Sequence, residues 1–215
     1  MIRLVIFDLD GTLLDTIGDL AASTNYALKR YGFPEHEAEA YRFFVGNGVS
    51  KLIERALPPE AREEAMVLKL REEFIRYYQT HKTDLTRPYP GIPQLLNHLQ
   101  SRDIVLAVAS NKYHQGTIEL IRYYFGDHCF SAVLGQREQV PVKPDPAIVY
   151  DILRQTGIEK TETLYVGDSG VDMQTAHNSG IVSIGVTWGF RPRQELEENG
   201  ACHLADHPTD IIGFL

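Results

Sequence analysis

LVIFDLDGT, at residues 4–12, is the most informative stretch of the chain, because an apolar run leads directly into two carboxylates with one residue between them. The apolar run predicts a β-strand, and Gly11 permits a turn where the strand ends. Asp8 and Asp10 can then face one pocket, where two such close acids repel each other unless a cation joins them. Magnesium takes hard oxygen ligands, typically one or two carboxylates with water and substrate phosphate. The strand end therefore predicts a magnesium site that handles phosphate.

Composition narrows the classes of partner. The 215 residues carry a formal net charge of −8, which argues against nucleic acid as a partner, because nucleic-acid binding depends on Lys and Arg. Asp8 interrupts the N-terminal apolar run too early for a signal peptide, and the run at 104–109 is too short to cross a bilayer, so no membrane partner is expected. Cys129 and Cys202 lack disulfide or metal spacing, which favours a cytoplasmic protein. No pattern indicates an oligomeric state.

Helical periodicity dominates the chain from Thr16 to about His81, and no convincing strand interrupts it. Three apolar stripes follow one another: Ile17, Leu20, Ala21, Leu28 and Tyr31; Val49, Leu52, Ile53, Ala56 and Leu57; and Met66, Leu70, Phe74, Tyr77, Tyr78 and His81. The proline-containing segment 83–91 then links this helical region to the C-terminal part of the chain.

Short apolar runs alternate with helix-length stretches in the rest of the chain, which is typical of a parallel sheet covered by helices. Strands are expected at 104–109, 132–134, 163–166 and 181–186, together with the first strand at 4–7. The predicted fold class is α/β, a Rossmann-like parallel sheet core with an inserted all-α helical cap domain. The core comprises residues 1–14 and 88–215 and the cap residues 15–87. The alternative is that the helical insertion only adds stability.

Polar residues follow several of these strands, at the edge of an open α/β sheet where ligands bind. Ser110 and Asn111 follow the strand at 104–109, and Asp168 follows the strand at 163–166, with Asp172 four residues later. Lys143 precedes a further helical stretch and offers a positive charge. Each has a simpler explanation by itself: Ser-Asn as a turn or helix cap, Lys-Pro as a solvated loop, and the two acids as a helix N-terminus favoured by its dipole.

Four motifs in chain order, DLDGT (8–12), ASN (109–111), KPDP (143–146) and GDSGVD (167–172), resemble those of the haloacid dehalogenase-like superfamily across the whole chain. The arrangement looks like the phosphatase branch with a helical cap inserted after the first motif. GNG at 46–48 and GVTWGFR at 185–191 resemble the phosphoglycolate phosphatase group.

The resemblance implies a division of labour among the acids. Asp8 is the nucleophile that forms an aspartyl-phosphate, and Asp10 protonates the leaving alcohol and then deprotonates the attacking water. Mg²⁺ is held by the Asp8 side chain, the Asp10 backbone carbonyl and Asp168, with Asp172 in its outer shell or as an alternative ligand. Lys143 offsets the negative charge of nucleophile and phosphate.

Substrate contacts are expected from two places. On the core side the resemblance implies Thr12, Ser110 and Asn111, with the Ser110 hydroxyl donating to a phosphate oxygen. On the cap side, backbone N–H groups of Gly46, Asn47 and Gly48 can bind an anion, although a plain turn explains this loop equally well. Arg42 and Lys51 flank the loop and are candidates to reach a substrate carboxylate.

The leading hypothesis is a Mg-dependent phosphatase that hydrolyses a small phosphorylated metabolite, with 2-phosphoglycolate the best guess. Asp10 motivates it, because the superfamily's dehalogenases have no leaving alcohol to protonate and no acid there. The alternative is a sugar phosphomutase that resembles β-phosphoglucomutase and returns the phosphoryl group to its substrate. A non-catalytic phosphate-binding regulatory module is the third hypothesis, and retention of both Asp8 and Asp10 argues against it.

Overall fold

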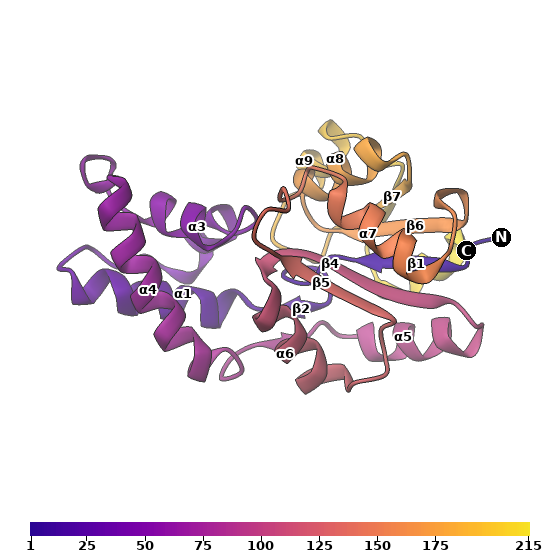
Figure 1. The fold of residues 1–215 in the computed structure, drawn as a ribbon, viewed down its shortest axis with the longest axis horizontal. Helices are drawn as coiled ribbons and strands as arrows, with labels where there is room; N and C mark the ends of the chain where they lie inside the picture. The colour runs from indigo at the N-terminus through magenta and orange to yellow at the C-terminus, as the bar shows by residue number, and fades with distance from the viewer.

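Six parallel strands form the sheet of the larger of two units in the computed structural model, which describes residues 1–215 (Figure 1). The strand order is β5-β4-β1-β6-β7-β8. The strands are β1 (Leu4–Phe7), β4 (Val105–Tyr113), β5 (Ala132–Gln136), β6 (Thr163–Gly167), β7 (Val182–Val186) and β8 (His203–Ala205). β1 lies inside the sheet, paired with β4 on one side and β6 on the other. The predicted α/β, Rossmann-like fold class is confirmed.

Helices cover both faces of this sheet (Figure 1). One face is covered by α5 (Ile92–Ser101), α6 (His114–Phe125) and the 3-10 segment η4 (Pro208–Phe214). The other face is covered by α7 (Ala147–Thr156) and α8 (Gly170–Ser179). The short helix α9 (Arg193–Glu198) packs on α8 and β7, and the 3-10 turn η3 (Lys160–Glu162) precedes β6. Val5 and Phe7 belong to the core on the first face, and Leu4 and Ile6 to the core on the second. Successive strand side chains point to opposite faces, so the continuous apolar run of β1 reflects a strand buried on both sides.

A separate helical unit contains α1 (Ile17–Arg30), α2 (Tyr41–Phe44), α3 (Val49–Ala56) and α4 (Glu64–His81), with the 3-10 turns η1 (Ala38–Ala40) and η2 (Pro59–Ala61). It has its own core of fifteen buried residues, among which Phe190 alone comes from the sheet unit. The three apolar stripes of the sequence lie on α1, α3 and α4, with their last residues just beyond α1 and α3. The limits predicted for the two domains stay a prediction.

Two chain crossings join the units, and they run side by side. β2 (Leu14–Asp15) leads into α1, and β3 (Arg87–Pro88) leads out of the helical unit; the two strands pair antiparallel. The buried Asp19 carboxylate fixes the second crossing to α1, because it accepts hydrogen bonds from the backbone N–H of Leu85 at 2.9 Å and from the backbone N–H and hydroxyl of Thr86 at 2.8 and 2.7 Å. The crossing is therefore a defined junction and not a loose linker.

The structure differs from the sequence-based expectation at β4 and in three additional short strands. The strand predicted over 104–109 continues to Tyr113, because its pairing with β5 resumes at Tyr113 and Gln136 after a register irregularity. The short edge strand β8 and the two-residue strands β2 and β3 were not predicted. None of the helices combines the length and apolar character that a bilayer crossing requires.

Candidate active site

The turn after β1 brings the first motif to the carboxyl edge of the sheet. Asp8 is 8% exposed, and its backbone N–H donates to the carbonyl oxygen of Val166 at 2.9 Å, which continues the sheet pairing up to the site. Gly11 then adopts a φ of +90°, and a Cβ atom at this position would lie 2.3 Å from Oδ2 of Asp168. Only glycine satisfies both the backbone conformation and the space.

Gly11→Ala is therefore expected to displace Asp168 or the turn and to destabilise the protein by about 2 kcal/mol or more, since left-handed backbone alone costs about 1–2 kcal/mol per residue. Thermal unfolding measures the loss, and activity should fall with it. Gly32→Ala is the matched control, because Gly32 also has a positive φ but nothing within 4 Å of its added Cβ. Equal effects of the two changes would show that backbone strain, and not contact with Asp168, is what matters.

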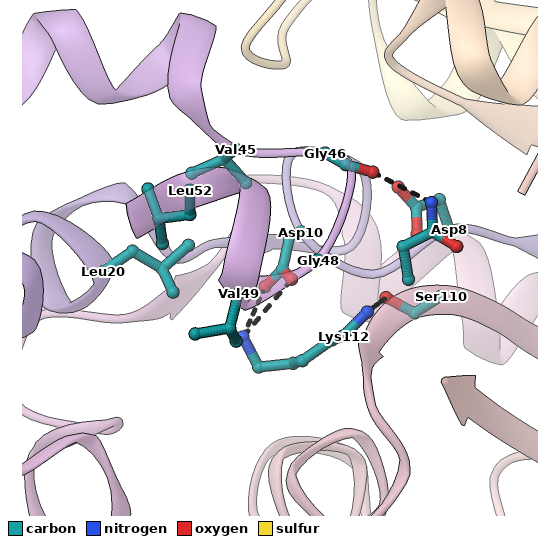
Figure 2. A pocket seen from close by; sticks show the side chains of 11 residues that line it. Asp8, Asp10, Leu20, Val45, Gly46, Gly48, Val49, Leu52, Ser110 and Lys112 are labelled. Atoms are coloured by element: carbon teal, nitrogen blue, oxygen red, sulfur yellow. Dashed lines mark hydrogen bonds and ion pairs between the residues drawn. The ribbon is translucent and has the colours of Figure 1, made fainter. Parts of the chain in front are cut away.

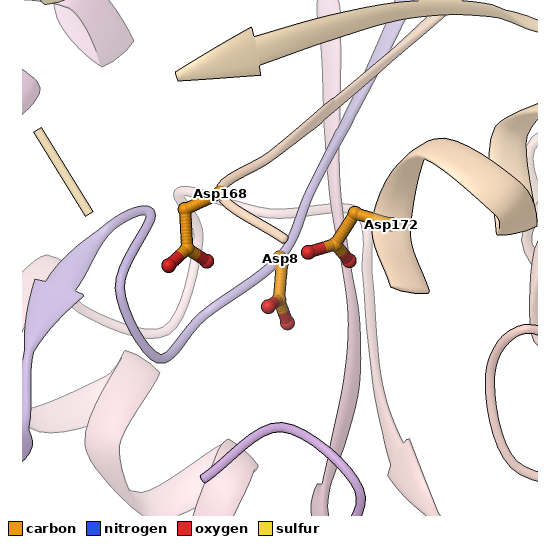
Figure 3. Close-up of side chains that lie close together, drawn as sticks. All are labelled: Asp8, Asp168 and Asp172. Atoms are coloured by element: carbon orange, nitrogen blue, oxygen red, sulfur yellow. The ribbon is translucent and has the colours of Figure 1, made fainter. Parts of the chain in front are cut away.

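Three buried carboxylates meet where β1, β6 and α8 converge. The ligand oxygens of Asp8, Asp168 and Asp172 all lie within 4.8 Å of one another (Figure 3). Burial, with the charge of Asp172, raises the pKa of Asp8 to about 7, and burial with the charges of Asp172 and Asp8 raises the pKa of Asp168. Oxygen ligands that repel one another in a buried site fit a hard divalent cation such as Mg²⁺. The Asp10 side chain does not belong to this cluster.

Asp168 is held in place from two sides. The Thr12 hydroxyl donates to Oδ1 at 3.2 Å, and the backbone N–H of Phe190 donates to Oδ2 at 2.7 Å. Thr12 is fully buried and does not line the cavity between the two units. The structure thus places Thr12 as a residue that orients Asp168, where the sequence had suggested a substrate contact.

Lys143 supplies positive charge to the cluster. Its ammonium group lies 3.0 Å from Oδ1 of Asp8 and 2.7 Å from Oδ1 of Asp172, and it donates to the Ala109 carbonyl at 2.9 Å and the Tyr165 hydroxyl at 3.1 Å. Burial by itself lowers the pKa of this lysine, but Asp172 and Asp8 together raise it well above its usual value. A permanently charged ammonium beside Asp8 suits a site that receives a phosphate dianion.

Asp172 has two sets of contacts in the structure. Its carboxylate pairs with Lys143, and it also closes a capping box at the start of α8, where Oδ2 accepts from the backbone N–H and hydroxyl of Ser169 at 3.2 and 2.6 Å. The helix-terminus explanation is thus correct for Asp172, but it does not exclude membership in the acidic cluster.

Asp10 has a different environment from Asp8, although only Leu9 separates them. The Lys112 ammonium lies 3.1 and 3.3 Å from the two Asp10 carboxylate oxygens, with side-chain exposures of 3% for Lys112 and 12% for Asp10. Lys112 also lies over the ring of Tyr78 in α4, 4.7 Å from its centroid. Sequence reasoning missed Lys112, because a lysine after Ser-Asn reads as a loop residue unless β4 is known to continue through it.

A cavity lies between the two units (Figure 2). The sheet unit contributes Asp8, Asp10, Ser110, Asn111 and Lys112, and the helical unit contributes Leu20, Val45, Gly46, Gly48, Val49 and Leu52. Ser110 accepts a hydrogen bond from the backbone N–H of Lys112 at 3.2 Å, so its hydroxyl hydrogen is free to donate elsewhere. The acids and the apolar residues of α1 and α3 thus face one space between the two units.

The loop at 46–48 is fastened to the sheet unit. The Asn111 amide donates to the Gly46 carbonyl at 3.0 Å, and Arg191 donates to the Val45 carbonyl at 2.8 Å. Asn47 does not line the cavity, because its side chain accepts a hydrogen bond from Arg55 at 2.7 Å. Asn111 therefore joins the two units, in addition to lining the cavity.

The two flanking basic residues do not reach the cavity. Arg42 donates to the Gly189 carbonyl at 3.3 Å, and the half-exposed Lys51 pairs with Glu54 at 2.7 Å. Neither lines the cavity, so their expected contact with a substrate carboxylate has no support in this arrangement.

The sequence was compared with models of known protein families. The family model for haloacid dehalogenase-like hydrolase matches residues 5–186, most of the chain. The chain belongs to the haloacid dehalogenase-like hydrolases. The family resemblance stated from the four motifs is thereby confirmed.

Individual relatives within the haloacid dehalogenase-like hydrolases are similar over the full length. A phosphoglycolate phosphatase of Haemophilus influenzae (strain 86-028NP) is 34% identical, covering 99% of this chain and 98% of the relative. One from Mannheimia succiniciproducens is also 34% identical, over 98% of this chain and 96% of the relative. A crystal structure from Haemophilus somnus 129pt, described as a predicted phosphoglycolate phosphatase, superimposes with a TM-score of 0.92 at 30% identity, covering 99% and 97% of the two chains. The expectation of a phosphoric monoester hydrolase similar to phosphoglycolate phosphatases is confirmed.

Proposed function

We propose that this haloacid dehalogenase-like hydrolase is a Mg²⁺-dependent phosphatase that hydrolyses a small phosphomonoester through an aspartyl-phosphate, with 2-phosphoglycolate as the preferred candidate. The observation that carries the proposal is the unequal environment of two neighbouring acids. Asp8 lies in the acidic cluster beside Lys143, whereas Asp10 lies outside it and faces the cavity. A metal-binding module would need no such separation.

Each acid has one part in the reaction. A carboxylate oxygen of Asp8 attacks phosphorus, the bond from phosphorus to the ester oxygen breaks, and Asp10 gives its proton to the departing alcohol. A water molecule then attacks the aspartyl-phosphate and passes a proton back to Asp10. Inorganic phosphate leaves, and the Asp8 carboxylate is regenerated, so both acids end in their starting states.

The expected Mg²⁺ ligands are the side chains of Asp8 and Asp168 and the backbone carbonyl of Asp10, with Asp172 as an outer-shell or alternative ligand. The buried, mutually repelling oxygens of the acidic cluster support this choice. When bound, Mg²⁺ neutralises charge on the phosphoryl oxygens. Thr12 and Phe190 keep Asp168 oriented, and Lys143 adds a fixed positive charge on the other side of Asp8.

Substrate contacts are assigned to the cavity walls. The Ser110 hydroxyl is expected to contact a phosphate oxygen, Asn111 to fix the loop above it, and Gly46 and Gly48 to bring backbone close to the substrate. Lys143 does not line the cavity and is expected to act through its charge beside Asp8. The position of the cavity between the two units favours a small metabolite, and exclusion of water by a bound substrate would strengthen the electrostatic interactions there. The two free cysteines of the chain suit the cytoplasm, where we place the protein.

A panel of phosphorylated metabolites, assayed with Mg²⁺ for inorganic phosphate, tests the proposal. We expect the highest kcat/KM for 2-phosphoglycolate among small phosphomonoesters. Incubation with hexose phosphates belongs in the same panel, because isomer formed without phosphate release would identify a mutase. Absence of turnover across the panel would instead indicate a phosphate-binding module, and either result would overturn the proposed function.

A further inference from the structure

Lys112 is the only basic side chain that lines the cavity, and it pairs with Asp10, which does not belong to the acidic cluster. Its side chain is only 3% exposed, and its ammonium reaches both carboxylate oxygens of Asp10. A buried contact of this kind is little screened by solvent and fixes a side chain more firmly than a surface ion pair does.

The backbone places Lys112 there by an unusual route. β4 continues past Ala109 through its register irregularity, and the backbone N–H of Lys112 donates to the Ser110 hydroxyl oxygen. The irregularity re-aims side chains at the end of β4, as bulges beside functional sites do. Ser110, Asn111 and Lys112 consequently all line the cavity, although only alternate residues of a regular strand share a face.

The second neighbour of the ammonium comes from the other unit. The ring of Tyr78 in α4 covers it at 4.7 Å, and the buried Tyr78 hydroxyl has no hydrogen-bond partner. The aromatic face, and not the hydroxyl, is therefore what Tyr78 presents to this group. Lys112 thus touches Asp10 in the sheet unit and α4 in the helical unit at the same time.

From these contacts we infer that Lys112 is a positioning residue that holds the Asp10 carboxyl in the orientation from which it serves the leaving alcohol, with Tyr78 of the helical unit closing over the pair. The inference rests on the proposed function, because it presupposes the acid–base role of Asp10. Proton transfer is sensitive to placement, and misplacement by about 1 Å can cost about 100-fold in rate.

Leaving-group dependence separates this role from a merely structural one. An alkyl phosphate needs its leaving oxygen protonated, whereas 4-nitrophenyl phosphate releases a stabilised anion that needs no proton. We expect Lys112→Met to lower kcat/KM for the alkyl phosphate about 10- to 100-fold more than for 4-nitrophenyl phosphate, within the range of about 10²–10⁴ for a whole general acid. The ratio of the two values in one preparation is independent of how much of the variant is folded.

Two further variants complete the test. Asp10→Asn should lower kcat/KM for the alkyl phosphate, relative to 4-nitrophenyl phosphate, at least as much as Lys112→Met does. Adding Lys112→Met to Asp10→Asn should not change this ratio further. Lys82→Met is the matched control, because Lys82 joins the two units through Glu119 at 2.5 Å, outside the cavity, and its loss should leave the ratio unchanged.

The possible failures are distinguishable. If Asp10→Asn treats both substrates alike, the acid–base role of Asp10 fails and the proposed mechanism fails with it. If Asp10→Asn discriminates but Lys112→Met does not, only the inference about Lys112 is wrong. A rise in KM for anionic substrates at unchanged kcat and unchanged ratio would make Lys112 a substrate-binding residue and would also overturn the inference.

Discussion

Asp8→Asn is expected to abolish phosphatase turnover, with kcat reduced on the order of 10⁴- to 10⁶-fold, because an amide cannot act as the nucleophile. The shape of the side chain is nearly unchanged, so the fold should persist. Phosphate release from 2-phosphoglycolate measures the loss. Asp103→Asn is the control, since it makes the same exchange at an exposed residue with a positive φ that Asn tolerates. Substantial residual activity in Asp8→Asn would contradict the aspartyl-phosphate mechanism.

The same variant has an expected pH signature in metal-free protein. Burial raises the pKa of Asp8 from its ordinary value of 3.8 to about 7, so folded protein binds more protons than unfolded protein between these two values. The contribution of Asp8 to the free energy of unfolding therefore falls as pH rises through this window. Asp8→Asn should lack this decline, and at pH 8 without metal it should unfold at a temperature no lower than the wild-type protein does.

Mg²⁺ removal is the second change with a large expected effect. Chelation should reduce kcat on the order of 1000-fold, since Lys143 alone then offsets the charge on the phosphoryl oxygens. Added Mg²⁺ should also stabilise the folded protein, by about 5 to 10 °C in Tm at a hundredfold excess over its Kd. Differential scanning fluorimetry with and without Mg²⁺ measures this shift separately from activity.

The variant Asp168→Asn tests whether the Mg²⁺-dependent rise in Tm comes from the acidic cluster. The variant should lose most of the Mg²⁺-dependent stabilisation, while Asp127→Asn, on the exposed surface, should retain it. An undiminished shift in Asp168→Asn would exclude Asp168 as a ligand. A shift absent from the wild-type protein would remove the support for a magnesium site altogether.

Most strands of the sheet could be predicted from the sequence, because buried strands leave short apolar runs in it; the order of the strands could not. β1 reads as a continuous apolar run because it lies between β4 and β6 and is covered on both faces. β8 carries no such signal, since it is three residues long and pairs only with β7. The end of β4 escaped prediction because the pairing of Tyr113 with Gln136 depends on a partner strand 23 residues away.

The candidate site shows the same limit at the level of single side chains. The sequence points to Asp8, Asp168 and Asp172, which the structure brings together, because acids after strands are visible in a linear pattern. The sequence does not reveal that Thr12 donates a hydrogen bond to Asp168 or that Lys112 pairs with Asp10, because the two residues of each pair are 156 and 102 positions apart in the chain. Contacts between residues so far apart in the sequence follow from the fold, and no local sequence pattern indicates them.

The paired crossings β2 and β3 have a consequence for how such a protein diversifies. Each unit keeps its own apolar core, and the chain passes between them at only one junction. Leu20, Val49 and Leu52 of the helical unit form one wall of the cavity, and the strand ends that carry the acids form the other. Substitutions in the helical unit can therefore change which substrate is accepted while the acids of the sheet unit stay the same. Substrate specificity and catalysis can evolve separately, because different segments of the chain encode them.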